Sequence, residues 1–447
     1  MRLFQTGSIV DYDALRTWRT YILETSTVDV VPTGAVRLER VSDDLHQLTT
    51  GGWMGSLTML ADGESHVLRI ADPKLDDPAW ARLLDDLAAA VGVLPLAELV
   101  DGTSAEHVPG PATRFIQALV TRAWRQRLQA AIETILRRPH ETLESESVWT
   151  TPDRARTATP AAVVAVMQRG AFGRGDAMAT RLGGVAPVTW LDTRRRTTSD
   201  TPENRFVRHA LERVLEIARW FPDDRELAAL GLTARHALTR PPLRGAARFD
   251  RFPSSSRALR KRPGYREMRD FYLALLGAVR VRWDGLDSVI RSGLRNTEVL
   301  YQYWCFVALQ RHLGVERPTL PTRRTRNQLH IELAEGLEAA VDTPAGRLWH
   351  ERTFRRPRES YAIELRPDFS LQRPDGRWEL FDAKFRIDDG LEAKHADLAK
   401  MHAYRDAITR CHASTVLYPG DHAETHRADP DDTDPHPSGI GVIPLRP

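Results

Sequence analysis

Two aspartates and a lysine in the C-terminal third of the chain have the residue types and spacing of a metal-assisted catalytic site. Asp382 and Lys384 are two residues apart, so on a strand both side chains face the same side of a sheet. Arg373-Pro374-Asp375-Gly376 predicts a hairpin turn between this strand and an earlier one that carries Asp368. The hairpin would bring Asp368 close to Asp382, and two such carboxylates repel each other unless a cation lies between them.

The chemistry that this set favours is attack of water on a phosphate ester. Carboxylate oxygens are good ligands for Mg²⁺ or Mn²⁺. A lysine beside the metal can orient or activate a water and stabilise a phosphorane-like transition state. The alternative is a surface hairpin with a stray ion pair between Asp382 and Lys384. The apolar strand LFDAKF argues against that alternative, because charges on such a strand need a reason.

The elements expected around this set form an α/β pattern from about residue 291. A helix is predicted over Thr297–Leu313 and another over about 391–411, each from its apolar periodicity. Strands are predicted near 329–331, 339–341, 347–354, 361–371, 378–385, 414–418 and 439–444. The Asp/Pro/His-rich stretch 420–437 is predicted to be a surface loop.

Residues 111–290 read as a mostly helical and basic middle domain. One long helix is predicted over 111–138, followed by a loop-rich stretch over 139–196. A further helix begins after Thr201, a good N-cap, and another covers 265–279. Between Arg240 and Arg269 there are ten basic residues and two acids, although the whole chain has a net charge of only +3. Such a stretch suits contact with phosphates, and equally suits a solvated arginine-rich surface.

Residues 1–110 read as a mixed β and α domain in which no chemistry is evident. Strands are predicted over 34–41 and 66–73, and a helix over 77–94 with Asp77 as its N-cap. Cys305 and Cys411 lie in apolar, helix-like patterns without metal-type spacing, so we expect reduced core thiols. With no signal-type segment and no apolar run of about 18 residues, a soluble, cytoplasmic protein is expected.

Several segments together resemble a known family. Pro367-Asp368 followed by Asp382-Ala383-Lys384 is similar to the PD-(D/E)xK nuclease signature. The other resembling segments are TPENRFVRHAL (201–211), NTEVLYQYWCFVAL (296–309), SYAIELRPDFSL (360–371), KMHAYRDAI (400–408) and GIGVIPLRP (439–447). Over residues 110–447 the chain looks like the McrC-like restriction-nuclease subunits, which carry an uncharacterised helical middle domain.

The resemblance implies a role for each matching residue. Asp368 and Asp382 would bind a divalent metal, Mg²⁺ or Mn²⁺, together with the backbone carbonyl of Ala383, and Lys384 would position the attacking water. These folds usually add an acid from the preceding helix, where relatives often carry Glu at the position of Gln302. Glu298 is four residues earlier on the same helix face and is our choice for that acid. It could equally be a helix N-terminal acid that complements the dipole.

The helix after the catalytic strand carries further candidates. Lys400, Tyr404 and Arg405 could reach DNA or support the metal site, whereas Met401 and Ile408 suit the core. His422 and His426 have a spacing that can bind zinc, but they lie in a polar loop without cysteine partners.

The sequence therefore predicts a multi-domain α+β protein: a mixed N-terminal α/β domain (1–110), possibly partner-binding, a helical middle domain (111–290) and a C-terminal restriction-endonuclease-like α/β domain (291–447). No GxxxxGK[ST] phosphate loop is present, so a nucleotide-driven motor would be a partner. The resemblance suggests a McrB-like AAA+ GTPase or ATPase, DNA as substrate, and defence against foreign DNA, with no membrane and a possible oligomer. The rivals are an inactive nuclease fold serving as scaffold or DNA-binding protein, and a metal hydrolase that does not cut nucleic acid.

Overall fold

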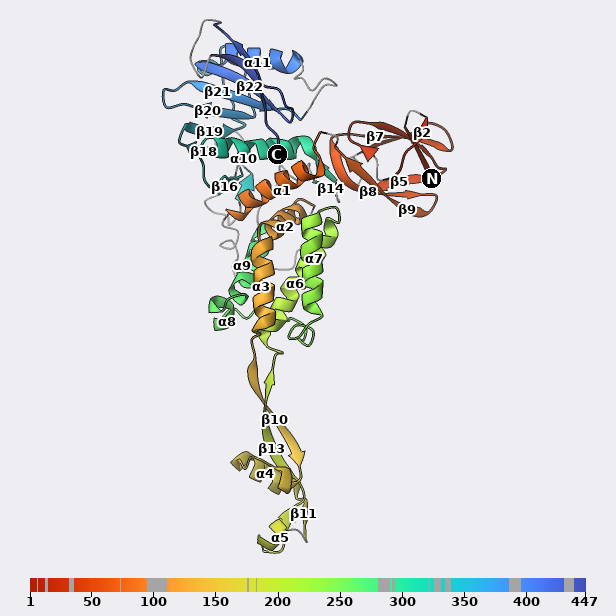
Figure 1. Ribbon diagram of the computed structural model, residues 1–447, viewed down its shortest axis with the longest axis vertical. Helices are drawn as coiled ribbons and strands as arrows, with labels where there is room; N and C mark the ends of the chain where they lie inside the picture. The colour runs from red at the N-terminus through yellow and green to blue at the C-terminus, as the bar shows by residue number, and fades with distance from the viewer. Residues whose placement is uncertain are drawn as a thin grey trace. The chain divides into compact units, whose positions relative to one another are not determined.

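A computed structural model (Figure 1) describes the chain except for residues 6, 13–14, 32–35, 73, 95–110, 175–176, 182, 280–289, 292–293, 321, 325–330, 334–338, 386–394 and 430–437. The chain divides into two compact units, each built from separate stretches of sequence. Unit 1 comprises Met1–Leu128, Val214–Leu232 and Arg269–Pro447, and unit 2 comprises Gln129–Arg213 and Thr233–Met268. The division into three domains near residues 110 and 290 stays a prediction.

The first part of unit 1 contains two sheets. One has the order β2-β1-β4-β7-β6 and the other β14-β15-β8-β9-β3, with β5 also paired to β8. The strands are β1 (Arg2–Gln5), β2 (Ser8–Ile9), β3 (Leu15–Arg16), β4 (Thr20–Glu24), β5 (Val28–Val31), β6 (Val36–Arg40), β7 (Leu45–Thr50), β8 (Trp53–Ala61), β9 (Glu64–Ala71), β14 (Ile290–Arg291) and β15 (Leu294–Asn296). A shared core contains Tyr21, Leu48 and Leu57. The strands expected over 34–41 and 66–73 are present as β6 and β9.

Two helix predictions within residues 77–138 differ in detail from the structure. Helix α1 (Asp77–Gly92) is capped by Asp76, whose side chain accepts a hydrogen bond from the N–H of Ala79, so the expected cap at Asp77 is wrong by one residue. The single helix predicted over 111–138 is interrupted at Trp124, which separates α2 (Pro111–Ala123) from α3 (Arg125–Arg137).

In unit 2, the prediction of a loop-rich stretch over 139–196 is wrong. Strands β10 (Thr142–Thr150) and β13 (Trp190–Thr198) form a nine-residue antiparallel ladder, in which Glu144 lies opposite Arg196 and Glu146 opposite Arg194. Opposite charges across an antiparallel ladder favour the pairing of its strands. Because most of these strands is exposed, the sequence lacks the alternation of apolar and polar residues by which a half-buried strand is recognised. Between the strands lie α4 (Pro160–Arg169), β11 (Phe172–Gly173), α5 (Ala177–Arg181) and β12 (Ala186–Pro187).

The helices of the middle region follow their sequence signals. Helix α6 (Pro202–Trp220) is capped by Thr201, whose hydroxyl oxygen accepts a hydrogen bond from the N–H of Asn204 at 3.2 Å. The helix predicted over 265–279 is α9 (Tyr265–Val279). The others are α7 (Arg225–Leu238) and α8 (Arg257–Lys261).

The last part of unit 1 is a seven-stranded sheet with the order β18-β19-β20-β21-β22-β24-β23. The strands are β18 (Ala340–Thr343), β19 (Gly346–His350), β20 (Phe369–Gln372), β21 (Trp378–Ala383), β22 (Cys411–Tyr418), β23 (Glu424–Arg427) and β24 (Gly439–Pro444), and the pairs β21–β22 and β22–β24 are parallel. A separate pair is formed by β16 (Thr322–Arg324) and β17 (Ile331–Leu333).

Two helices cover opposite faces of this sheet (Figure 1). Phe306 of α10 (Thr297–His312) stacks on Phe369, with ring centroids 5.8 Å apart. Met401 and Tyr404 of α11 (His395–Ala407) lie in one core cluster with Leu380, whose side chain faces away from that of its neighbour Phe381. The sheet is therefore the middle layer of an α/β sandwich, as expected for the C-terminal domain.

Some predicted boundaries in this domain are wrong. The segment 361–367 is not a strand. Leu365 makes an isolated bridge with Phe354, and strand pairing begins after Pro367, which lacks an N–H. The helix expected to reach Cys411 ends at Ala407, and Cys411 begins β22. Strand β23 lies within the predicted loop 420–437. Cys305 is buried and Cys411 half-buried, and both are free thiols. Among the described helices, none is both long and apolar enough for a membrane span.

Candidate active site

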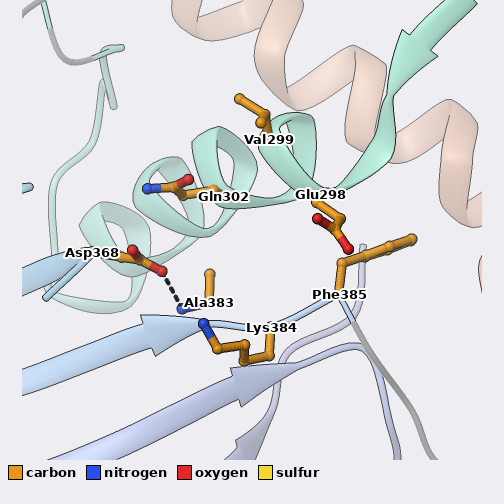
Figure 2. Close-up of a pocket in the computed structure, with 7 residues that line it drawn as sticks. All are labelled: Glu298, Val299, Gln302, Asp368, Ala383, Lys384 and Phe385. Atoms are coloured by element: carbon orange, nitrogen blue, oxygen red, sulfur yellow. Dashed lines mark hydrogen bonds between the residues drawn. The ribbon is translucent and has the colours of Figure 1, made fainter. Parts of the chain in front are cut away.

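Strand register places the two candidate aspartates opposite each other. The pairs of β20 and β21 run from Gln372↔Trp378 to Phe369↔Phe381, so Asp368 and Asp382 are the next residues in the same register. The Oδ2 atom of Asp368 accepts a hydrogen bond of 2.7 Å from the N–H of Ala383 (Figure 2). Asp368 thus lies one residue before β20, and not on the strand as expected. The hairpin nevertheless brings the two carboxylates together.

Lys384 lies one residue beyond the end of β21 and still continues the ladder. Its N–H donates a hydrogen bond of 2.8 Å to the carbonyl oxygen of Leu417 on the neighbouring strand. The backbone is therefore held at this residue, while its side chain is a quarter exposed.

A cavity of about 260 Å³ opens at this edge of the sheet. Figure 2 shows the residues that line it, some from α10 and some from the ends of the two strands. They are Glu298, Val299, Gln302, Asp368, Ala383, Lys384 and Phe385. Five of the residues predicted from the sequence (Glu298, Gln302, Asp368, Ala383 and Lys384) therefore meet at one cavity.

Asp382 is fully buried and lies between two lysines. Lys384 Nζ is 2.5 Å from Asp382 Oδ2, an ion pair without hydrogen-bond geometry, and Lys400 Nζ donates a hydrogen bond of 2.9 Å to Oδ1. Lys400 comes from α11, and its side chain is 42% exposed. Two ammonium groups thus offset the cost of burying one carboxylate in this arrangement.

The electrostatics of the site centre on the two carboxylates. Burial, and then the charge of Asp382, raises the pKa of Asp368 to about 7. Burial alone would lower the pKa of Lys400, but the charge of Asp382 and the hydrogen bond to it raise that pKa overall. Burial and the Asp382 charge also raise the pKa of the Tyr404 hydroxyl. Burial therefore disfavours the ionised form of Asp368, and the charge of Asp382 adds to this effect.

The free energy of unfolding, measured in the presence of a chelator, tests the raised pKa of Asp368. The folded-state pKa of Asp368 lies above the ordinary value of 3.8, so its protonated form favours folding, and that contribution is lost as pH rises toward 7. Asp368→Asn should therefore gain stability over wild type between pH 4 and 7, by about 1–3 kcal/mol at neutral pH. Urea unfolding at several pH values would measure the difference.

Asp375→Asn is the matched control for that measurement. The hydrogen bonds and charge of Arg377 lower the pKa of this turn aspartate, so its substitution should not stabilise the neutral protein. A flat difference between wild type and Asp368→Asn across this pH range would contradict a raised pKa of Asp368.

The N-cap of α10 determines the position of Glu298, the candidate helix acid. The side chain of Asn296 caps the helix by accepting hydrogen bonds from the N–H groups of Glu298 and Val299, at 3.1 and 3.3 Å. Glu298 thereby lies in the first turn and also lines the cavity, so its placement suits both a metal ligand and an acid that complements the helix dipole.

Sequence reasoning missed Glu351, which follows β19 directly. Its Oε1 accepts a hydrogen bond of 3.2 Å from Gln302 Nε2, and Arg366 pairs with its other oxygen. Its N–H donates to the carbonyl oxygen of Asp368 at 2.7 Å, and its φ is +50°. A non-glycine residue in this conformation is strained. No motif marks Glu351, because its contacts exist only once β19, β20 and α10 have packed.

The three candidates on α11 have different places. Lys400 contacts Asp382, as described. Tyr404 is buried in the core, and its hydroxyl donates to the carbonyl oxygen of Arg366 at 3.3 Å. Arg405 contacts Asp406 and Ser438, outside the cavity lining. In the part of the chain that the structure describes, no three His, Cys, Asp or Glu side chains are grouped as metal ligands, and His422 and His426 form no such group.

Comparison with known families locates this site within a nuclease domain. Residues 299–423 match the PD-(D/E)XK nuclease superfamily, and this range contains Asp368, Asp382 and Lys384. The C-terminal domain is a PD-(D/E)XK nuclease domain. Residues 82–272 match a domain of unknown function, DUF2357. The PD-(D/E)xK nuclease domain expected from the sequence is thereby confirmed, and a domain of unknown function precedes it in the chain.

Two solved structures from Thermococcus gammatolerans are similar to the chain. One is a half-complex from a tetradecameric assembly of McrB AAA+ hexamers with bound McrC, with a TM-score of 0.33 and 12% identity over 91% of this chain and 80% of the other. The second is the McrBC complex, with a TM-score of 0.22 and 15% identity over 69% of this chain and 78% of the other. No curated protein matches the chain.

Proposed function

We propose that this protein is the nuclease subunit of a McrBC-like restriction system and cleaves DNA by metal-dependent hydrolysis. The observation that carries the proposal is the pair Asp368 and Asp382, opposite each other in strand register, with Lys384 beside them at a cavity of a PD-(D/E)XK domain. An inactive scaffold has no need of all three groups.

The residues fit a hard divalent cation. Burial and then the charge of Asp382 raise the pKa of Asp368, and a bound cation would favour the ionised form of both carboxylates. The donors offered by residues that line the cavity are oxygens: the carboxylates of Asp368 and Glu298 and the carbonyl of Ala383. The buried carboxylate of Asp382 is opposite Asp368 in strand register. Such a set suits Mg²⁺ or Mn²⁺ rather than zinc. A bound cation would polarise the scissile phosphate and lower the pKa of a water.

Lys384 and Lys400 would have different roles in the reaction. Lys384 lines the cavity and would hold the attacking water and stabilise the charge that develops on the phosphate. Lys400 does not line the cavity, and it would hold Asp382 through the 2.9 Å hydrogen bond. Nucleic acid would contact the protein through basic surface, for which the mostly exposed arginines between residues 240 and 269 are candidates.

The proposed partner is an AAA+ NTPase. The sequence lacks a phosphate loop, so energy from nucleotide hydrolysis would come from a second protein. The two similar assemblies contain McrC bound to McrB, which is an AAA+ hexamer in one of them. We infer a McrB-like AAA+ protein as the partner and defence against foreign DNA as the setting.

A plasmid assay tests the proposed function. The protein would be incubated with supercoiled DNA and Mg²⁺ or Mn²⁺, with and without chelator, and with and without a candidate AAA+ partner and nucleotide. Metal-dependent nicking or linearisation is the expected result. If DNA is not cleaved under any combination of metal, partner and nucleotide, the inactive-scaffold alternative replaces the proposal. Cleavage of RNA alone would correct the substrate.

The helix acid has its own prediction. Glu298→Gln should lower the cleavage rate by about 10–100-fold and weaken Mn²⁺ binding, because a carboxylate at the cavity becomes neutral. Gln302→Glu is the informative partner variant, since it restores the residue that relatives often carry but brings a second carboxylate against Glu351. If Glu298→Gln matches wild type in rate and in Mn²⁺ binding by calorimetry, Glu298 serves the helix dipole alone.

A further inference from the structure

The N-terminal sheet of unit 1 holds the start of the helix that lines the site. Strand β15 pairs with β8, so that Asn296 lies opposite Trp53. At the next residue, the N–H and the hydroxyl of Thr297 both donate to the carbonyl oxygen of Gly52, at 2.9 and 3.1 Å. Thr297 is fully buried, and Glu298 follows it directly. The first turn of α10 is therefore fixed by residues from the other end of the sequence.

A second contact from the N-terminal region reaches the end of the catalytic strand. Lys74 Nζ donates a hydrogen bond of 2.7 Å to the carbonyl oxygen of Phe385 and lies 4.8 Å from the centre of its ring. Phe385 lines the cavity and follows Lys384 directly, and its ring is 5.1 Å from that of Tyr301 on α10. Lys74 thus contacts the residue at which β21, α10 and the cavity meet.

Buried polar groups hold Lys74 in place. Its N–H donates to Asp72 Oδ1 at 3.0 Å, and the hydroxyl of Thr17 donates to Asp72 Oδ2 at 2.7 Å. Asp72 and Thr17 are 4% and 3% exposed, so this turn after β9 is tied into the N-terminal core. A lysine presented from a fixed turn loses less conformational entropy when it contacts Phe385 than one on a mobile loop.

We propose that the N-terminal region is a working part of the nuclease site and that Lys74 is a positioning residue for Lys384. The inference rests on the proposed function. Phe385 lies two residues beyond the end of β21, and the carbonyl group that Lys74 holds belongs to the residue directly after Lys384. Releasing that carbonyl lets the end of β21 shift, and a shift of about 1 Å at a catalytic group costs on the order of a hundredfold in rate. Lys74 does not line the cavity, so we expect DNA binding to be unaffected by its loss.

Kinetics with a conservative rescue test the positioning role. Lys74→Met should lower kcat by about 10–100-fold with KM for DNA nearly unchanged, and Lys74→Arg should recover most of the loss, because it keeps a donor. Arg82→Met is the matched control: Arg82 Nη2 donates to the carbonyl oxygen of Pro447 at 2.8 Å, a contact between the same two regions away from the cavity. It should leave kcat unchanged.

Hydrogen–deuterium exchange without metal provides a readout independent of cleavage. In Lys74→Met, peptides that cover residues 379–385 should exchange faster than in wild type, while those of β22 keep their protection. Thr297→Val, which removes the hydroxyl contact with Gly52, should raise exchange at the first turn of α10 instead.

The outcomes separate the two proposals. Unchanged kcat and unchanged exchange in Lys74→Met would overturn the positioning role and leave the nuclease function intact. If wild type never cleaves nucleic acid, the nuclease function is rejected even when Lys74→Met exchanges faster than wild type. The positioning role for that reaction is then rejected as well. A rise in KM without loss of kcat would make Lys74 a DNA contact and overturn the role proposed here.

Discussion

Replacing Lys384 by alanine should reduce the plasmid-cleavage rate by about 10²–10⁴-fold while the protein remains folded. The side chain lines the cavity beside Asp368 and lies 2.5 Å from Asp382, so alanine removes the cation nearest to the reacting phosphate. Asp382 keeps the hydrogen bond from Lys400, and the buried carboxylate is not left without a cation. The variant should therefore unfold within about 1 kcal/mol of wild type in urea.

Arg377→Ala serves as the control for this variant. Arg377 is another cation on the same hairpin, but it pairs with Asp375 at the turn, far along the strands from the cavity. It should cleave at the wild-type rate. Equal rates for wild type and Lys384→Ala, measured under conditions in which wild type is metal-dependent, would mean that this hairpin is not the catalytic centre.

Asp382→Asn should abolish cleavage and weaken Mn²⁺ binding by at least about 100-fold. The carboxylate is fully buried and opposes Asp368, so the substitution removes one of the three carboxylates that would hold a cation. The effect on stability should be small, because the ammonium groups of Lys384 and Lys400 are partly exposed and can turn to water. Loss of function without loss of fold distinguishes a ligand from a structural ion pair.

Calorimetric titration with Mn²⁺ and urea unfolding would measure these two effects. Asp375→Asn is the control, since it neutralises an exposed aspartate in the same hairpin and should change neither quantity by much. A variant at Asp382 that binds Mn²⁺ as wild type does, but unfolds several kcal/mol more easily, would assign Asp382 to structure alone.

The hairpin and its register could be predicted from sequence because they are local. The turn Arg373–Gly376 and the alternation along β21 suffice to place Asp368 opposite Asp382. The ends of the strands could not be predicted in the same way. Whether Asp368 and Lys384 lie on or just beyond a strand depends on where neighbouring strands stop, which is a property of the whole sheet.

The contacts that complete the site come from distant parts of the sequence. Glu351 meets Gln302 through the packing of a helix on a sheet, and Lys74 meets Phe385 across most of the chain. Neither residue belongs to a recognisable spacing pattern. The ladder of β10 and β13 was missed for another reason: its strands are largely exposed and rich in charged residues, so no hydrophobic periodicity marks them.

The pairing of β15 with β8 also has a consequence for the order in which the protein is made. Strand β8 leaves the ribosome long before β15, and the chain for the whole of unit 2 is synthesised between them. The first turn of α10 can find its support on Gly52 only after that delay, and the catalytic hairpin is translated later still. A nascent chain therefore carries no assembled candidate site until β8, α10 and the hairpin of Asp368 and Asp382 have all been translated.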